Sequence, residues 1–125
     1  MILKVCKYFL FVLSFCFASA QVNDIFIDSL IKNEDVRFFQ NLEYGYGKRN
    51  KLDLLIPKSK IKTPIVIFLH GGGYKGGNKE SSYKKNNIGR VRRILRNKIA
   101  FATINYSFLN NNDGLLSSLN DAKLA

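Results

Sequence analysis

The sequence predicts an α/β fold in which a mainly parallel sheet is flanked by helices, and three observations lead to this prediction. The run Ile65–Leu69 is apolar at five successive positions, which is typical of a parallel strand covered on both faces. Residues 82–97 then carry apolar side chains at spacings of three and four, as an amphipathic helix does. Residues 99–107 form a second, mostly apolar run. Strand, helix and strand in this order indicate a mainly parallel α/β sheet.

The remaining elements are predicted from shorter patterns. Apolar residues near helical spacing predict a short helix over residues 22–33. Residues 41–47 and 51–57 flank a polar corner and predict the two strands of a hairpin. In the second of these strands, alternation places three side chains on one face: Leu52, Leu54 and Ile56. A second helix is expected over residues 115–125, after an Asn-rich turn.

Length and composition limit the class of protein. A chain of 125 residues with 46% hydrophobic and 13% aromatic content is a single domain at most and is not a disordered tail. Its 2 cysteines exclude a disulfide-rich scaffold and a multi-thiolate zinc site, and His70 is its 1 histidine. The net charge of +11 is weak support for an anionic partner, because lysine is abundant along the whole chain.

The first twenty residues are predicted to be a secretory signal peptide. Lys4 and Lys7 precede an apolar stretch, and residues 18–20 (Ala-Ser-Ala) end it with the small residues that favour cleavage after Ala20. A transmembrane anchor is the first alternative, but the apolar run is shorter than the roughly 20 residues that span a bilayer. Lipid attachment at Cys16 is the second. We therefore expect an exported protein, secreted or periplasmic, with its domain over residues 21–125.

The most informative segment is residues 65–77, which read IVIFLHGGGYKGG. The glycines follow a buried strand directly, at the carboxyl end where open α/β sheets bind ligands. The string His70-Gly71-Gly72-Gly73 fits the HGGG type of oxyanion loop. Such a loop holds developing negative charge with backbone N–H groups, which requires a tight bend and no shielding side chains.

Three other kinds of glycine-rich segment are the alternatives. The G-x-G-x-x-G spacing of Gly71–Gly76 fits a dinucleotide fingerprint, but residues 81–112 contain no Asp or Glu to hold the ribose. A phosphate-binding P-loop needs Gly-Lys-Ser/Thr, and Gly77 is followed by Asn-Lys-Glu instead. A plain glycine-rich turn between strand and helix stays open as the structural alternative.

The segment PIVIFLHGGGYKGGNKES resembles the third strand and oxyanion loop of α/β-hydrolase-fold esterases. It is most similar to the carboxylesterase group that includes bifunctional feruloyl and acetylxylan esterase-like proteins. The similarity extends back to YGYGKRNKLDLLIP and forward through IAFATINYSF to NDAKLA, over residues 41–125. Ser107 replaces the usual Arg and Tyr74 a common Trp. The resemblance implies the incomplete, amino-terminal half of an α/β-hydrolase fold, truncated before the nucleophile elbow.

The resemblance also implies roles for individual residues. Gly72 and Gly73 would present the oxyanion N–H groups, and His70 and Gly71 would orient the loop. The chain contains no G-x-S-x-G elbow and no second histidine, so we expect no catalytic residue of a Ser/Asp/His triad in it and no activity from it alone. The implied whole protein is an exported serine carboxylic-ester hydrolase without cofactor or metal, acting on a small-molecule or carbohydrate-linked ester.

Two other functions stay open at this stage. A related peptidase or formamidase shares the same opening strands. A non-catalytic, exported basic module could instead bind an anionic polymer through five basic residues in and just after the predicted helix: Arg90, Arg92, Arg93, Arg96 and Lys98. The esterase interpretation itself implies no nucleic acid partner and no membrane partner. With the elbow strand missing, Ile65–Leu69 should form an exposed apolar edge and leave the fold marginally stable.

Overall fold

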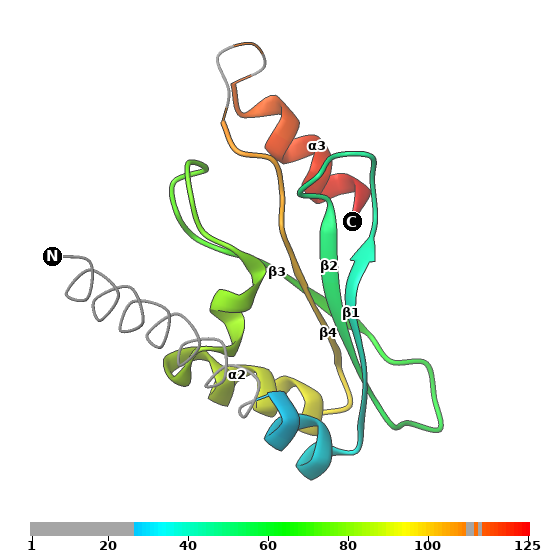
Figure 1. Cartoon of the computed structure of the whole chain (residues 1–125). Coiled ribbons are helices and arrows are strands. Elements are labelled where there is room, and N and C mark those ends of the chain that lie inside the picture. The colour runs from blue at the N-terminus through cyan, green and yellow to red at the C-terminus, as the bar shows by residue number, and fades with distance from the viewer. Residues whose placement is uncertain (1–26, 110–111, 113) are drawn as a thin grey trace, which may run out of the picture.

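The structure is a computed structural model that describes residues 27–109, 112 and 114–125. A four-stranded sheet forms its centre, with helices packed against it (Figure 1). Residues 27–34 are helical, and the elements that follow are β1 (Val36–Glu43), β2 (Lys51–Pro57), β3 (Ile65–Leu69), the 3₁₀ helix η1 (Lys79–Tyr83), α2 (Lys85–Arg96), β4 (Ala100–Ile104) and α3 (Leu116–Leu124). The predicted signal peptide and the start of the predicted first helix lie outside the described residues. In the described part of the chain, no helix is long and apolar enough to cross a bilayer.

The sheet has the strand order β1-β2-β4-β3. Strand β2 pairs antiparallel with β1 and with β4, whereas β3 pairs parallel with β4. The α/β fold class is thus confirmed, but the sheet is mixed rather than mainly parallel. Parallel pairing needs a long crossover connection, and η1 with α2 supplies one between β3 and β4. The hairpin of β1 and β2 needs only a turn, so it adds two antiparallel pairings.

The hairpin differs from its prediction at the first strand. Strand β1 ends at Glu43, and residues 44–50 form a turn where a strand over 41–47 was predicted. In this turn the backbone at Gly45 and Gly47 lies so close to the Asn50 side chain that a Cβ atom at either glycine would be only 2.8 or 2.5 Å from Asn50 Oδ1. These two glycines therefore pack on the Asn50 side chain instead of continuing a strand.

The better buried face of β2 is not the one with the leucine alternation. Asp53 and Leu55 are both 0% exposed, and Pro57 is buried with them. The three residues singled out by alternation do share a face, but that face is only half-buried: Leu52, Leu54 and Ile56. The sequence pattern did not predict this face as the buried one because it contains Asp53, and ionised carboxylates are almost never fully buried unless paired.

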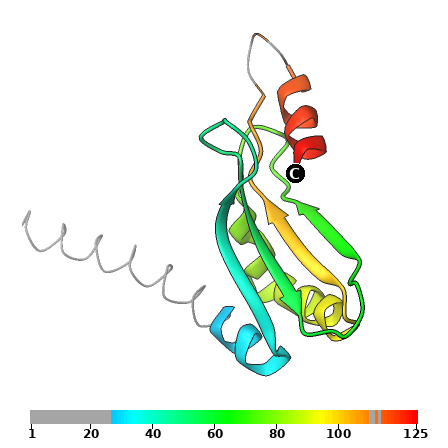
Figure 2. The same cartoon turned by 90° about the vertical axis from the view of Figure 1, so that its right-hand side faces the viewer.

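The hydrophobic core lies between α2 and the middle of the sheet, and Figure 2 shows α2 behind the strands. Every position of β4 is buried. The predicted spacing of three and four is confirmed in α2, where Ile88, Val91 and Leu95 face the core. The first residues of the predicted helix instead form η1, ahead of α2.

Strand β3 lies at the edge of the described sheet, and its side chains are exposed as expected for an unpaired edge. The exposed fraction is 53% for Ile65 and 43% for Leu69. The continuous apolar run predicted a strand covered on both faces, and among the described residues that cover is incomplete. The side chains of β3 are thus apolar enough for a buried strand, but the described residues leave them largely exposed.

Candidate functional site

The candidate site is the glycine loop, residues 70–77, which connects the carboxyl end of β3 to η1. Gly72, Gly73 and Gly77 all have positive φ angles, of 134°, 60° and 97°. A Cβ atom at Gly72 would lie 2.1 Å from the Gly76 carbonyl oxygen, and one at Gly77 would lie 2.3 Å from the Gly71 carbonyl oxygen. The bend at these two positions therefore excludes any side chain.

Gly72 and Gly73 line a pocket of about 200 Å³. Within the part of the chain that the structure describes, neither of their backbone N–H groups donates a hydrogen bond to another residue. The other lining residues are Leu69, His70, Gly71, Tyr74 and Tyr106. Two adjacent, unengaged donors beside such a pocket can bind an oxygen that carries negative charge.

His70 is buried beneath the loop, with 2% of its surface exposed. Its Nδ1 lies 2.9 Å from the Gly71 carbonyl oxygen. A carbonyl only accepts, so in this contact Nδ1 is the donor. The ring stacks on Tyr106 with centroids 4.4 Å apart, and the Tyr106 hydroxyl donates to the His70 carbonyl oxygen at 2.6 Å. His70 is thus packed to hold the loop and is shielded from solvent.

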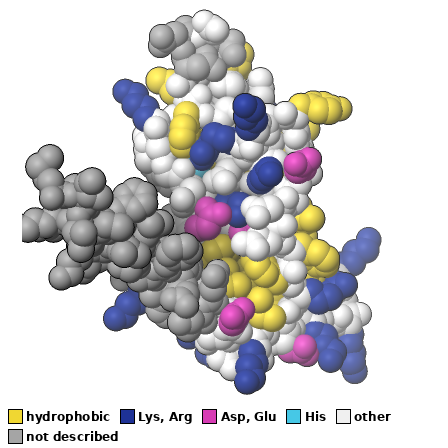
Figure 3. All heavy atoms as spheres, in the orientation of Figure 1, with side chains coloured by type: hydrophobic (Ala, Val, Ile, Leu, Met, Phe, Trp, Pro, Cys, Tyr) yellow, Lys and Arg dark blue, Asp and Glu magenta, His cyan; other side chains and the backbone are white. Residues whose placement is uncertain are grey.

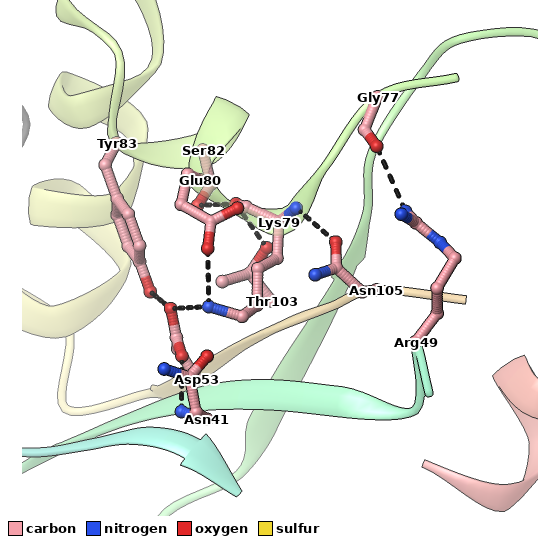
Figure 4. Close-up of polar contacts among 10 residues, drawn as sticks. All are labelled: Asn41, Arg49, Asp53, Gly77, Lys79, Glu80, Ser82, Tyr83, Thr103 and Asn105. Carbon is pink, nitrogen blue, oxygen red and sulfur yellow. Dashed lines mark hydrogen bonds and ion pairs between the residues drawn. The ribbon is translucent and has the colours of Figure 1, made fainter. Parts of the chain in front are cut away.

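The carboxyl end of the loop is fixed by a buried polar cluster of Asp53, Lys79, Tyr83 and Thr103 (Figure 4). The ion pair between Lys79 Nζ and Asp53 Oδ2 measures 2.8 Å, and the two side chains are 1% and 0% exposed. The Tyr83 hydroxyl donates to the same carboxylate oxygen at 3.1 Å. Thr103 donates to the Lys79 carbonyl oxygen at 2.9 Å. The cluster joins η1 to β2 and β4, directly after the glycines.

Burial also changes the acid–base behaviour of this cluster. Removal from water, reinforced by the nearby Asp53 carboxylate, raises the pKa of the Tyr83 hydroxyl far above its usual value. Tyr83 therefore stays a neutral donor to Asp53 at all ordinary pH values. Sequence reasoning missed this cluster, although an aspartate between the apolar residues of β2 was a signal that a cation must be buried nearby.

Three of the four arginines of α2 contact neighbouring side chains of the protein. Arg92 Nε and Arg96 Nη2 lie 3.4 and 2.9 Å from Glu34 Oε1, and Arg90 donates to Asn87 Oδ1 at 2.9 Å. Lys and Arg side chains are spread over the face drawn in Figure 3 rather than gathered in one patch. Among residues 27–109, 112 and 114–125, no group of three or more potential metal ligands lies together. The arrangement therefore gives no specific support to a polymer-binding module.

Comparison with known structures shows the fold. A putative thioesterase from Silicibacter sp. tm1040 superposes with a TM-score of 0.61 at 23% identity, over 84% of this chain and 37% of that one. Esterase B from Lactobacillus rhamnosis gives a TM-score of 0.52 at 24% identity, over 90% of this chain and 36% of that one. The same esterase inhibited by a C6-C4 SN3 compound gives 0.53 at 23%, over 90% and 37%. This chain thus spans little more than a third of the length of these structures.

Comparison at the level of sequence identifies a family. No curated protein sequence matches the chain. The profile of the BD-FAE family, however, matches residues 52–125, which are more than half of the chain and include the glycine loop, η1 and β4. The chain therefore belongs to the BD-FAE family of esterase-like α/β hydrolases, of whose fold it forms an amino-terminal part.

Proposed function

We propose that these residues are the amino-terminal part of an exported serine carboxylic-ester hydrolase and that they supply its oxyanion loop. The observation that carries the proposal is the pair of unengaged N–H groups, Gly72 and Gly73, beside the pocket at the end of β3. Ester hydrolysis passes through a tetrahedral intermediate whose oxygen becomes negatively charged. Donors that are already fixed toward that oxygen lower the barrier without reorganisation during the reaction.

The covalent chemistry is assigned to residues outside this chain. The sequence has no G-x-S-x-G elbow, and His70 is buried against Tyr106 and bonded to the Gly71 carbonyl. A general base must reach the proton that it removes, and His70 in this position reaches only its own loop. We therefore assign His70 and Gly71 to orientation of the loop, and the serine, acid and base to further residues of the whole protein.

The substrate is a small-molecule or carbohydrate-linked ester. The walls of the pocket, Leu69, Tyr74 and Tyr106, favour an apolar or aromatic group beside the reacting carbonyl. The solved relatives are a putative thioesterase and an esterase, which supports ester rather than amide hydrolysis. Export rests on the amino-terminal sequence pattern and would place the substrate outside the cytoplasm.

Hydrolysis of p-nitrophenyl acetate by the product of the complete reading frame tests this function. The wild-type protein should hydrolyse the ester, and Gly72→Ala should lower kcat by about 10²–10³-fold because the added Cβ atom displaces the donors. Gly89→Ala is the matched control: a Cβ atom there meets nothing within 4 Å, and the site lies on the exposed face of α2.

Three results would contradict the proposal. The first is a complete protein that hydrolyses no ester, and the second is a Gly72→Ala variant as active as the wild type. The third is preferential cleavage of an amide such as a p-nitroanilide, which would favour the peptidase or formamidase alternative. The 125-residue chain alone should show no hydrolysis above the buffer rate.

A further inference from the structure

Arg49 lies in the turn between β1 and β2, far from the glycine loop in sequence, and contacts it in space. Its Nη2 donates to the Gly77 carbonyl oxygen at 3.0 Å, as the dashed line in Figure 4 shows. Its Nε donates to the Tyr106 carbonyl oxygen at 2.8 Å. Its guanidinium carbon lies 3.7 Å from the ring centroid of Phe108. These contacts form the Arg49 clamp, which joins three separate segments.

Both carbonyl groups of the Arg49 clamp belong to residues that hold His70. Gly77 approaches the imidazole so closely that a Cβ atom on it would lie 2.5 Å from Nδ1. The Tyr106 ring stacks on the imidazole, and its hydroxyl donates to the His70 carbonyl oxygen. Arg49 thus joins the end of the glycine loop to the segment that follows β4, and His70 packs against both.

The turn that carries Arg49 is itself held in place. Asn50, which is 4% exposed, accepts from the Gly47 N–H at 2.7 Å through Oδ1. The Asn50 N–H donates back to the Gly47 carbonyl oxygen at 2.9 Å. A guanidinium on such a turn has a planar set of donors in a fixed direction, which a lysine ammonium cannot reproduce.

We propose that Arg49 is a positioning residue that sets the direction of the Gly72 and Gly73 N–H groups. The inference rests on the proposed function and adds to it a residue outside the glycine loop. Gly77 ends the loop in which Gly72 and Gly73 bend, so a shift of Gly77 is transmitted to the donors through only a few peptide units. For this role the positive charge of Arg49 matters less than the fork of its guanidinium, that is, the two N–H donors held in one plane toward the Gly77 and Tyr106 carbonyl groups.

The test is a titration of the ¹⁵N-labelled full chain with acetate, whose carboxylate serves as a probe for an anionic oxygen. Acetate replaces chloride at constant ionic strength, and the amide shifts of Gly72 and Gly73 report its Kd. We expect Arg49→Met to weaken acetate binding by about tenfold or more, which corresponds to about 1.4 kcal/mol. Arg49→Lys keeps the charge but loses the fork, and it should weaken binding nearly as much.

The matched control is Arg93→Met, which removes an equal charge from the exposed face of α2. It should leave the Kd for acetate within twofold of the wild type. If Arg49→Lys binds acetate as well as the wild type does, charge alone explains the effect and the positioning role is wrong. A lower melting temperature of Arg49→Met with an unchanged Kd would reduce Arg49 to a structural residue and also overturn the inference.

One further outcome separates this inference from the function beneath it. If acetate shifts neither glycine amide in the wild type, the two N–H groups do not bind an anionic oxygen. The proposed oxyanion loop then fails, and the role of Arg49 fails with it. If the wild type binds and the Arg49 variants bind equally well, only the inference about Arg49 fails.

Discussion

Strands β3 and β4 are neighbours in the sheet, have five residues each and carry no charged side chain, yet the more apolar of the two, β3, is the exposed one. Strand β4 is buried at every position because β2 and β3 flank it and α2 covers it. Strand β3 has one neighbour among the described strands and is mostly exposed. The position of a strand in the sheet therefore decides its burial, and an apolar composition is not sufficient for it. Four predictions follow from this contrast between the centre and the edge.

The largest effect is expected from removing the cation of the buried ion pair. Lys79→Met leaves the Asp53 carboxylate buried without its cation, which should cost about 3–5 kcal/mol of unfolding free energy. Urea denaturation followed by circular dichroism measures this loss. Lys58→Met is the control, because the Lys58 and Asp35 side chains are 81% and 74% exposed and their pair should be worth little. Equal losses in the two variants would contradict the role of the cluster.

A matched isoleucine pair compares the two strands directly. Ile104→Ala in β4 should cost about 2–5 kcal/mol, because the side chain is 0% exposed and its removal leaves a cavity. Ile65→Ala in β3 should cost about 1 kcal/mol or less, since the side chain is already 53% exposed. Thermal melts of both variants under one set of conditions give the comparison. Similar losses would mean that β3 is buried in solution.

Alkaline pH should lower the unfolding free energy through Tyr83, which is buried at the centre of the molecule. Burial raises the pKa of Tyr83 above the value of 10.0 for a free tyrosine, so the unfolded chain releases this proton first. The stability that Tyr83 contributes is therefore present below pH 10 and declines above it, by up to about 1.4 kcal/mol per pH unit. Melts at pH 9 to 11 should show a shallower decline for Tyr83→Phe. Tyr46→Phe, at a fully exposed tyrosine, should leave the slope unchanged.

The smallest effect on stability is expected at the exposed edge, where a charge should instead reduce self-association. Ile65→Lys places an ammonium on an unpaired apolar strand, which opposes edge-to-edge pairing. The melting temperature should hardly change, and light scattering should show less association. Ile61→Lys, at a residue 79% exposed but outside β3, is the control for charge alone. If both variants reduce association equally, the edge of β3 is not the surface involved.

The elements that the sequence predicted best are those with a long or unbroken pattern. Ile65–Leu69 has the predicted bounds, and α2 has its apolar face at the predicted spacing. The glycine loop follows β3 as expected, and its two sterically required glycines include Gly72. These features depend on neighbours in the chain, so local patterns contain the information.

The features that sequence reasoning missed depend on contacts between distant residues. The pairing of Lys79 with Asp53 joins positions 26 apart, and nothing near Lys79 distinguishes it from the exposed lysines of the chain. Arg49 contacts Gly77 and Tyr106, 28 and 57 positions away. The hairpin strand was misplaced because the glycines at 45 and 47 pack on Asn50, a contact that a strand pattern cannot show.

The strand order has a consequence for the order of folding. Strand β4 lies between β2 and β3, so β3 has no described partner until β4 is in place. During synthesis the glycine loop leaves the ribosome before residues 100–104, and closing this long connection costs chain entropy. The hairpin of β1 and β2 is local and can form early. We therefore expect the candidate site to take its final shape only after β4, the strand that supports it, has been made.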